Sequence, residues 1–168
     1  MPDRDFFRQD ATVLAPALLG KILVRTLPDG TELRFRISET EAYCGTEDTA
    51  CHAHKGRTQR SDVLWRDGGT VYVYLCYGIH WMLNVVSGTE GDAQAVLIRG
   101  CFEAQGPGRL TKALRIDGSL NGQDILDCSG LRLEDDGAEV DITYGKRVGI
   151  DYADERDRER LWRYTAKL

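Results

Sequence analysis

Residues 71–86 read VYVYLCYGIHWMLNVV and contain two apolar runs, Val71–Cys76 and Ile79–Val86. Both runs are rich in β-branched and aromatic residues, which fit the pleated, half-buried surface of a strand. Only Tyr77-Gly78 separates them, and two apolar runs with so short a link predict a tight antiparallel hairpin. The centre of the chain is therefore expected to hold a β-sheet.

More strands are expected on both sides of this hairpin. Pro28-Asp29-Gly30 is a strong turn signal between two of them. Three further strands are expected over residues 22–26, 31–42 and 93–100. Two short strands are expected near Leu131 and near Ile142, and residues 147–150 are expected to form a final extended piece.

Two helices are expected to flank the sheet. Asp10 is a suitable N-cap for an apolar helix that reaches Leu19, and the turn Gly106-Pro107-Gly108 precedes a helix over residues 109–116. Residues 154–164 are highly charged and fit either helix or coil. Because strands dominate without a regular alternation with helices, the sequence predicts one α+β domain over residues 1–168. This domain is expected to be built on a curved, mostly antiparallel sheet with flanking helices.

Length and composition exclude several classes of protein. The 168 residues are 42% hydrophobic and 29% charged, which is typical of a globular domain rather than a disordered chain. No apolar run approaches the roughly 20 residues that span a bilayer, so no membrane association is expected. The five cysteines are an odd number without a CxxC pair, which indicates a reduced, intracellular (cytoplasmic) protein and argues against a zinc site.

The net charge of −5 is unevenly distributed. Residues 117–141 contain eight acidic residues and one basic residue, so the rest of the chain carries a net charge of +2. A polyanion could bind the basic stretches if the acidic segment points elsewhere. A solvated surface of mixed charge is the alternative. The basic stretches are Lys55, Arg57 and Arg60, and Arg99, Arg109, Lys112 and Arg115.

The expected strand over residues 31–42 leads into residues 43–60, a polar stretch that reads as a long loop. Long loops inside compact domains are usually functional. At this junction, strand alternation places Glu39, Glu41 and Tyr43 on one face. A carboxylate beside an aromatic ring is suited to general-base chemistry next to a stacking surface. Composition alone favours the alternative, two solvated glutamates.

Two other features carry competing interpretations. His52 and His54 lie close to Cys51, but without a second ligand pair their spacing predicts a metal site only weakly. Tyr77 stands at the hairpin turn, where Asn, Asp or Gly is usual. An aromatic side chain there is suited to insertion between base steps. The alternative is that Tyr77 folds back on a neighbouring loop.

Arg99 and Asn84 are polar residues in or at the end of apolar strands. A buried arginine needs a carboxylate or an anion as partner, and a buried amide must be hydrogen-bonded to protein or ligand. Either residue could therefore bind a ligand, or could be purely structural.

Taken together, these stretches resemble the alkyladenine (3-methyladenine) DNA glycosylase family. The resemblance covers residues 6–164 in at least six motifs in the same order. The segment between Arg99 and Gly106 is shorter than is usual in that family. The matching motifs are ETEAY (39–43), Glu47-Asp48 with Ala50 and His52, GRT (56–58) with Arg60, YVY (72–74) with Tyr77-Gly78 and Asn84, VLIR (96–99), GPGRL (106–110), RVGI (147–150) and WRY (162–164).

The resemblance implies catalytic roles for three residues. Glu41 corresponds to the general base that activates water for attack on C1′ of the deoxyribose. Arg99 corresponds to an arginine that helps to hold this water. Val148 corresponds to a position whose backbone carbonyl does the same.

The resemblance also implies a pocket for a flipped base, with Tyr43, His52 and Tyr74 as its stacking walls. Asn84 corresponds to the residue that rejects the 2-amino group of guanine. Tyr77 corresponds to the aromatic residue that intercalates into the gap in the duplex.

The function implied is that of a monofunctional DNA glycosylase, and residues 1–168 are then one glycosylase domain. Its substrates would be alkylated or deaminated purines in double-stranded DNA, namely 3-methyladenine, 7-methylguanine, hypoxanthine and ethenoadenine. No metal or organic cofactor is implied, no lysine stands at a matched catalytic position, and a monomer is expected. The alternative is a noncatalytic module with the same fold that binds damaged nucleic acid.

Overall fold

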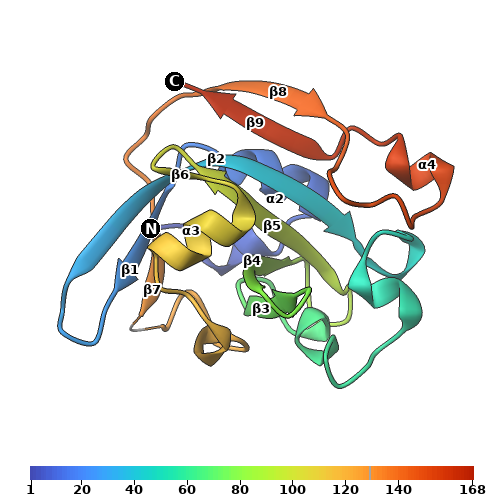
Figure 1. The fold of residues 1–168 in the computed structure, drawn as a ribbon, viewed down its shortest axis with the longest axis horizontal. Helices are drawn as coiled ribbons and strands as arrows, with labels where there is room; N and C mark the ends of the chain where they lie inside the picture. The colour runs from blue at the N-terminus through green and yellow to red at the C-terminus, as the bar shows by residue number, and fades with distance from the viewer. Residues whose placement is uncertain (129) are drawn as a thin grey trace.

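The computed structural model of the protein describes residues 1–128 and 130–168. These residues form nine strands and four α-helices (Figure 1). The strands are β1 (Ile22–Thr26), β2 (Glu32–Cys44), β3 (Val71–Cys76), β4 (His80–Ser87), β5 (Gln94–Cys101), β6 (Ala104–Gln105), β7 (Leu131–Glu134), β8 (Asp141–Gly145) and β9 (Arg163–Lys167). The helices are α1 (Arg4–Phe7), α2 (Ala11–Leu18), α3 (Pro107–Ala113) and α4 (Glu155–Arg158).

The strands form a sheet in the order β3-β4-β5-β2-β1-β7, and each neighbouring pair is antiparallel. The long strand β2 binds β1 with its first half and β5 with its second half. Two register shifts between Ile37 and Thr40 mark an irregularity of the β-bulge type, which bends a strand. This bend lets the second half of β2 also pair with β9. The prediction of an α+β fold on a curved, mostly antiparallel sheet is confirmed.

Apolar side chains of the helices and strands form the main core. Helix α2 packs on β2 and β5, and α3 packs on β4 and β5 (Figure 1). The carboxylate of Asp10 accepts a hydrogen bond from the Thr12 amide and caps α2, as the sequence predicts. None of the described helices is both long and apolar enough to cross a membrane.

The structure corrects the expectations for the C-terminal part. Residues 154–164 were expected to be helix or coil, but they contain α4 and the beginning of the strand β9. Two of the five residues of β9 are charged, and its strand geometry comes from pairing with β2 and β8 rather than from an apolar pattern. Residues 147–150, expected to be extended, form an irregular turn instead, in which Gly149 has a φ of 75°.

Candidate active site

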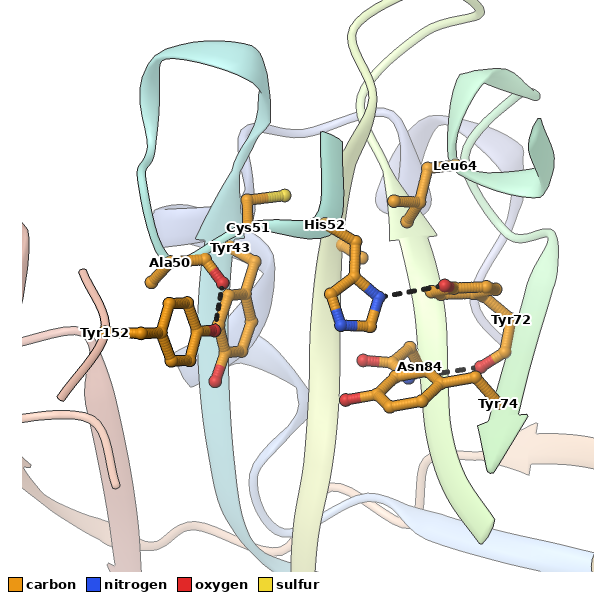
Figure 2. A pocket seen from close by; sticks show the side chains of 10 residues that line it. Tyr43, Ala50, Cys51, His52, Leu64, Tyr72, Tyr74, Asn84 and Tyr152 are labelled. Carbon is orange, nitrogen blue, oxygen red and sulfur yellow. Dashed lines mark hydrogen bonds between the residues drawn. The ribbon is translucent and has the colours of Figure 1, made fainter. Parts of the chain in front are cut away.

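A pocket opens to solvent between β2, β3, β4 and the segment that follows β2 (Figure 2), and its empty volume of about 340 Å³ includes open solvent at its mouth. All four residues predicted to contact the base line it: Tyr43, His52, Tyr74 and Asn84. The complete lining is Tyr43, Ala50, Cys51, His52, Leu64, Tyr72, Tyr74, Asn84, Ala95 and Tyr152. The cavity therefore has aromatic walls with a few polar groups between them.

One wall consists of aromatic rings that contact one another edge to face or at a tilt. The ring centroids of His52 and Tyr74 are 4.5 Å apart, and those of Tyr72 and Tyr74 are 5.3 Å apart. His52 Nδ1 lies 3.0 Å from the hydroxyl of Tyr72, which fixes the orientation of the imidazole. Burial, with a smaller contribution from Arg60, lowers the pKa of His52, so the ring is neutral at pH 7. Tyr43 faces this wall from the other side of the cavity (Figure 2).

Asn84 lies at the base of the aromatic wall and is only 4% exposed. Its side-chain nitrogen donates hydrogen bonds to the backbone carbonyls of Tyr72 (3.2 Å) and Met82 (3.4 Å). These bonds hold the amide against the β3–β4 hairpin and leave its oxygen at the cavity (Figure 2). An acceptor that faces a cavity and has no partner among the described hydrogen bonds is available to a ligand.

Glu41 is fully buried next to this cavity. Its Oε1 accepts a 3.0 Å hydrogen bond from the hydroxyl of Tyr43, and its Oε2 accepts a 2.7 Å bond from the amide of Val148. Arg99 Nη1 lies 3.6 Å from Oε1. Arg99 also pairs with Glu39, so neither glutamate is a solvated surface group and that alternative is wrong.

Burial raises the pKa of Glu41, and the charge of Arg99 opposes this rise more than any other group. The Val148 amide and the Tyr43 hydroxyl also favour the ionised form. A carboxylate that is desolvated but kept charged by a neighbouring arginine is suited to accept a proton from water. The resemblance implies that the carbonyl of Val148 helps to hold the water. The contact that the structure shows is different, because the amide of Val148 donates a hydrogen bond to Glu41.

Tyr77 is at the tip of the β3–β4 hairpin and is 90% exposed. Its φ is 52° and that of Gly78 is 67°, the pattern of a type I′ turn. A bulky residue in this left-handed conformation is strained, and such strain is concentrated at functional sites. The alternative that Tyr77 folds back on a neighbouring loop is wrong.

The histidines near Cys51 point to different partners. His52 binds Tyr72, whereas Nδ1 of His54 lies 2.8 Å from the carbonyl oxygen of Thr46. Over residues 1–128 and 130–168, no group of three or more His, Cys, Asp or Glu side chains is arranged to hold a metal ion.

An ion pair buried behind Tyr43 was not predicted as part of the site. Arg147 donates to both carboxylate oxygens of Asp48, at 2.6 and 3.0 Å, and to the carbonyl of Ala42. Its guanidinium lies 4.9 Å from the ring centroids of both Tyr43 and Trp162. The motif RVGI contains Arg147, but nothing in the sequence indicates that its charge is buried. Tyr152, which also lines the cavity, was missed as well.

Part of the acidic segment is neutralised at the other end of the sheet. Its strand β7 lies beside β1, far from residues 45–60 in Figure 1. Three of its acidic side chains pair with Lys21, just before β1, and with two arginines of β2. A polyanion near the cavity would therefore not face β7, whereas the beginning of the segment packs against the β3–β4 hairpin, where Asn121 accepts a 3.0 Å hydrogen bond from the Val73 amide. The pairs are Glu134 with Arg34, Asp135 with Lys21, and Asp136 with Arg36.

Comparison with known proteins assigns the chain to a family. A family model described as "Methylpurine-DNA glycosylase (MPG)" matches residues 5–103 and 102–168. The two matched stretches meet between Arg99 and Gly106.

Curated relatives are similar over nearly their whole length. A "Putative 3-methyladenine DNA glycosylase" of Natranaerobius thermophilus is 41% identical over 186 residues, covering 96% of this chain and 93% of the relative. Proteins of the same name from Borreliella burgdorferi and Psychrobacter cryohalolentis are each 43% identical. These matches cover 98% and 95% of this chain, and 95% and 88% of the relatives. On this similarity, the chain belongs to the methylpurine-DNA glycosylase family.

Proposed function

We propose that this DNA glycosylase releases alkylated or deaminated purines from double-stranded DNA by hydrolysis of the N-glycosidic bond, with Glu41 as the general base. The observation that carries the proposal is the buried carboxylate of Glu41, held by Arg99 and the Val148 amide beside an aromatic cavity. Glu41 would take a proton from the water that attacks C1′ of the deoxyribose. Arg99 would keep this base ionised and help to hold the water.

Base flipping is part of the proposal because a base that stays stacked inside a duplex cannot enter a cavity in the protein. Extruding a base costs a few kcal/mol, and least for a damaged or mispaired base. Stacking on an aromatic side chain returns about 1–3 kcal/mol per base. The rings of Tyr43 on one side and of His52 and Tyr74 on the other would roughly offset the cost of extrusion. Phosphate contacts would then supply the net affinity.

We propose a monofunctional reaction that leaves an abasic site. Cleavage of the strand through a Schiff base would need an amine nucleophile at the sugar. None of the lining residues is a lysine. Lys146 is close in sequence to Val148, but its ammonium group pairs with Glu159 at 2.6 Å and is half-exposed.

The alternative, a noncatalytic binding module, has less support. Binding alone does not require a carboxylate to be desolvated, because burial of a charge is costly. The bonds that hold Glu41 are explained by a reaction that needs an ionised base at that point. We further propose that one chain is sufficient and acts where the DNA is, inside the cell.

The experiment that tests the function uses duplexes containing hypoxanthine, 1,N6-ethenoadenine or 3-methyladenine. We expect abasic sites that break only after alkali treatment, and intact strands without it. Tight binding of damaged duplexes without any release of base would support the noncatalytic module instead. Strand breaks before alkali would contradict the monofunctional reaction.

The Tyr77→Ala variant should excise bases about tenfold more slowly or worse and bind damaged duplexes less tightly. Without Tyr77, nothing fills the stack after extrusion, and one aromatic contact is worth about 1–3 kcal/mol. Because the side chain is exposed at the hairpin tip, the melting temperature should change little. Single-turnover rates and thermal melts measure both effects. A large loss of stability with unchanged excision would show that Tyr77 is structural.

The Asn84→Ser variant should lose selectivity against guanine. The amide at the cavity would press against the 2-amino group of guanine, and a smaller side chain leaves room for it. We expect the ratio of guanine excision (from G·T) to hypoxanthine excision (from I·T) to rise about tenfold, within the range of steric discrimination. Single-turnover rates give this ratio. If it stays constant in a folded variant, Asn84 is only a structural amide.

A further inference from the structure

Tyr152 stands at the mouth of the cavity. It is 68% exposed, yet it lines the cavity, and its hydroxyl donates a 2.7 Å hydrogen bond to the backbone carbonyl of Ala50. Figure 2 shows this bond on the same side of the cavity as Tyr43. Holding an exposed side chain in one rotamer costs conformational entropy. Because the ring is largely exposed, its burial does not explain why the side chain is held in this rotamer.

The residues that precede Tyr152 contact the proposed general base. Residues 147–153 are here called the RVGI loop. In this loop, the amide of Val148 donates a 2.7 Å hydrogen bond to Glu41. Further along the loop, Ile150 and Ala153 are buried in a small apolar cluster with Ala50. The loop thus contacts Glu41 near its beginning and Ala50 near its end.

Both backbone polar groups of Ala50 are connected to the RVGI loop. The Ala50 amide donates to Asp48 at 3.1 Å, and Asp48 pairs with Arg147 at the start of the loop. The Ala50 carbonyl accepts from Tyr152 near the end of the loop. Ala50 is two residues before His52, which forms part of the stacking wall. The backbone of Ala50 is therefore joined to the loop by two polar connections, one buried and one at the surface, in addition to the apolar cluster.

We propose that Tyr152 is a positioning residue whose hydroxyl fastens the RVGI loop, and with it the amide that orients Glu41, to Ala50 in the segment that leads to His52. This inference rests on the proposed function of Glu41. The bond to Ala50 keeps the loop against this segment at the open side of the cavity, where the buried Arg147–Asp48 pair does not reach. Loss of the hydroxyl would let the loop move and lengthen the Val148 bond to Glu41.

A movement of the RVGI loop would change the pKa of Glu41, and this change can be measured. Glu41 faces Arg99 from β5, the Tyr43 hydroxyl from its own strand, and Arg147 with the Val148 amide from the RVGI loop. Burial raises its pKa, and the Val148 amide lowers it. A weaker Val148 bond would raise the pKa of Glu41. The acid limb of the excision rate would then move to higher pH.

The test compares Tyr152→Phe and Tyr152→Ala with the wild type. Tyr144→Phe is the matched control, because Tyr144 is 57% exposed and does not line the cavity. One hydrogen bond contributes about 0.5–1.5 kcal/mol, so Tyr152→Phe should slow single-turnover excision about 2- to 10-fold. We expect its acid limb at higher pH and faster hydrogen exchange of the amides of residues 147–153. Binding of undamaged duplex should not change.

The outcomes separate the inference from the function on which it rests. If the wild type releases no base, the proposed function fails, and hydrogen exchange alone decides whether the hydroxyl fastens the loop. Unchanged exchange in Tyr152→Phe overturns the inference in every case. It is also overturned if Tyr152→Phe keeps the wild-type rate and acid limb while only Tyr152→Ala is slow, because then the ring acts and not the hydroxyl. Rates are measured well below the melting temperature, so that lost stability alone does not lower them.

Discussion

The Glu41→Gln variant should lose about 10²- to 10⁴-fold in single-turnover excision, the usual contribution of a general base. Glutamine keeps the size of the side chain and can still accept a hydrogen bond from the Val148 amide. It cannot take a proton from water at neutral pH. Affinity for a duplex that contains ethenoadenine should stay close to wild type, because Glu41 does not line the cavity.

The same variant should be at least as stable as the wild type near neutral pH. Burial raises the pKa of Glu41 in the folded chain above its unfolded value. A carboxyl of this kind stabilises the fold while it is protonated, and this contribution is lost as the pH rises through the folded pKa. Removing the charge therefore removes a cost of folding. Arg99 keeps Glu39 as its partner, at 3.5 Å.

Rates under enzyme excess, duplex binding and melting temperatures at pH 7 together test this prediction. A Glu41→Gln variant that keeps more than about a tenth of the wild-type rate would exclude Glu41 as the base. A collapse of the fold would make the rate uninformative, in which case Glu41→Asp, which keeps an ionisable group, should retain measurable excision with a shifted pH dependence.

The sheet could be predicted from sequence wherever a strand is apolar on its own. The β3–β4 hairpin and β5 follow from runs of β-branched and aromatic residues. In contrast, β9 has the sequence RYTAK, and its strand geometry depends on partners in β2 and β8 that are distant in the chain. Pairing between distant segments leaves no local pattern, so this element could not be predicted.

The same distinction holds for the site. Strand alternation alone placed Glu41 and Tyr43 on one face, and their 3.0 Å hydrogen bond agrees with that. The partner of Arg147 is Asp48, 99 residues away, and an arginine in a sequence is normally read as exposed. Tyr152 resembles any surface tyrosine until the fold brings it to Ala50. Contacts across the cavity depend on the tertiary fold.

The Arg99→Met variant should lose activity most strongly at acidic pH and regain part of it as the pH rises. Arg99 opposes the rise in the pKa of Glu41 more than any other group, so its removal raises this pKa further. At a pH below that pKa, each unit by which the pKa rises lowers the ionised fraction of Glu41, and hence the rate, about tenfold. A rate that follows ionisation rises with pH, whereas Glu41→Gln should stay inactive at every pH.

Arg163→Met is the matched control for this variant. Arg163 pairs with Glu39 at 3.2 Å, as Arg99 does at 3.5 Å, but it forms no ion pair with Glu41 among the described contacts. Its removal should leave the acid limb where it is. In Arg99→Met, the melting temperature should also fall more steeply from acid to neutral pH than in the wild type. The reason is that the pKa of Glu41 is raised more strongly, and this adds stability only while Glu41 is protonated. If Arg99→Met is slow at all pH values and its melting curve follows that of the wild type, Arg99 does not act through the ionisation of Glu41, and its role is to hold the water or the substrate.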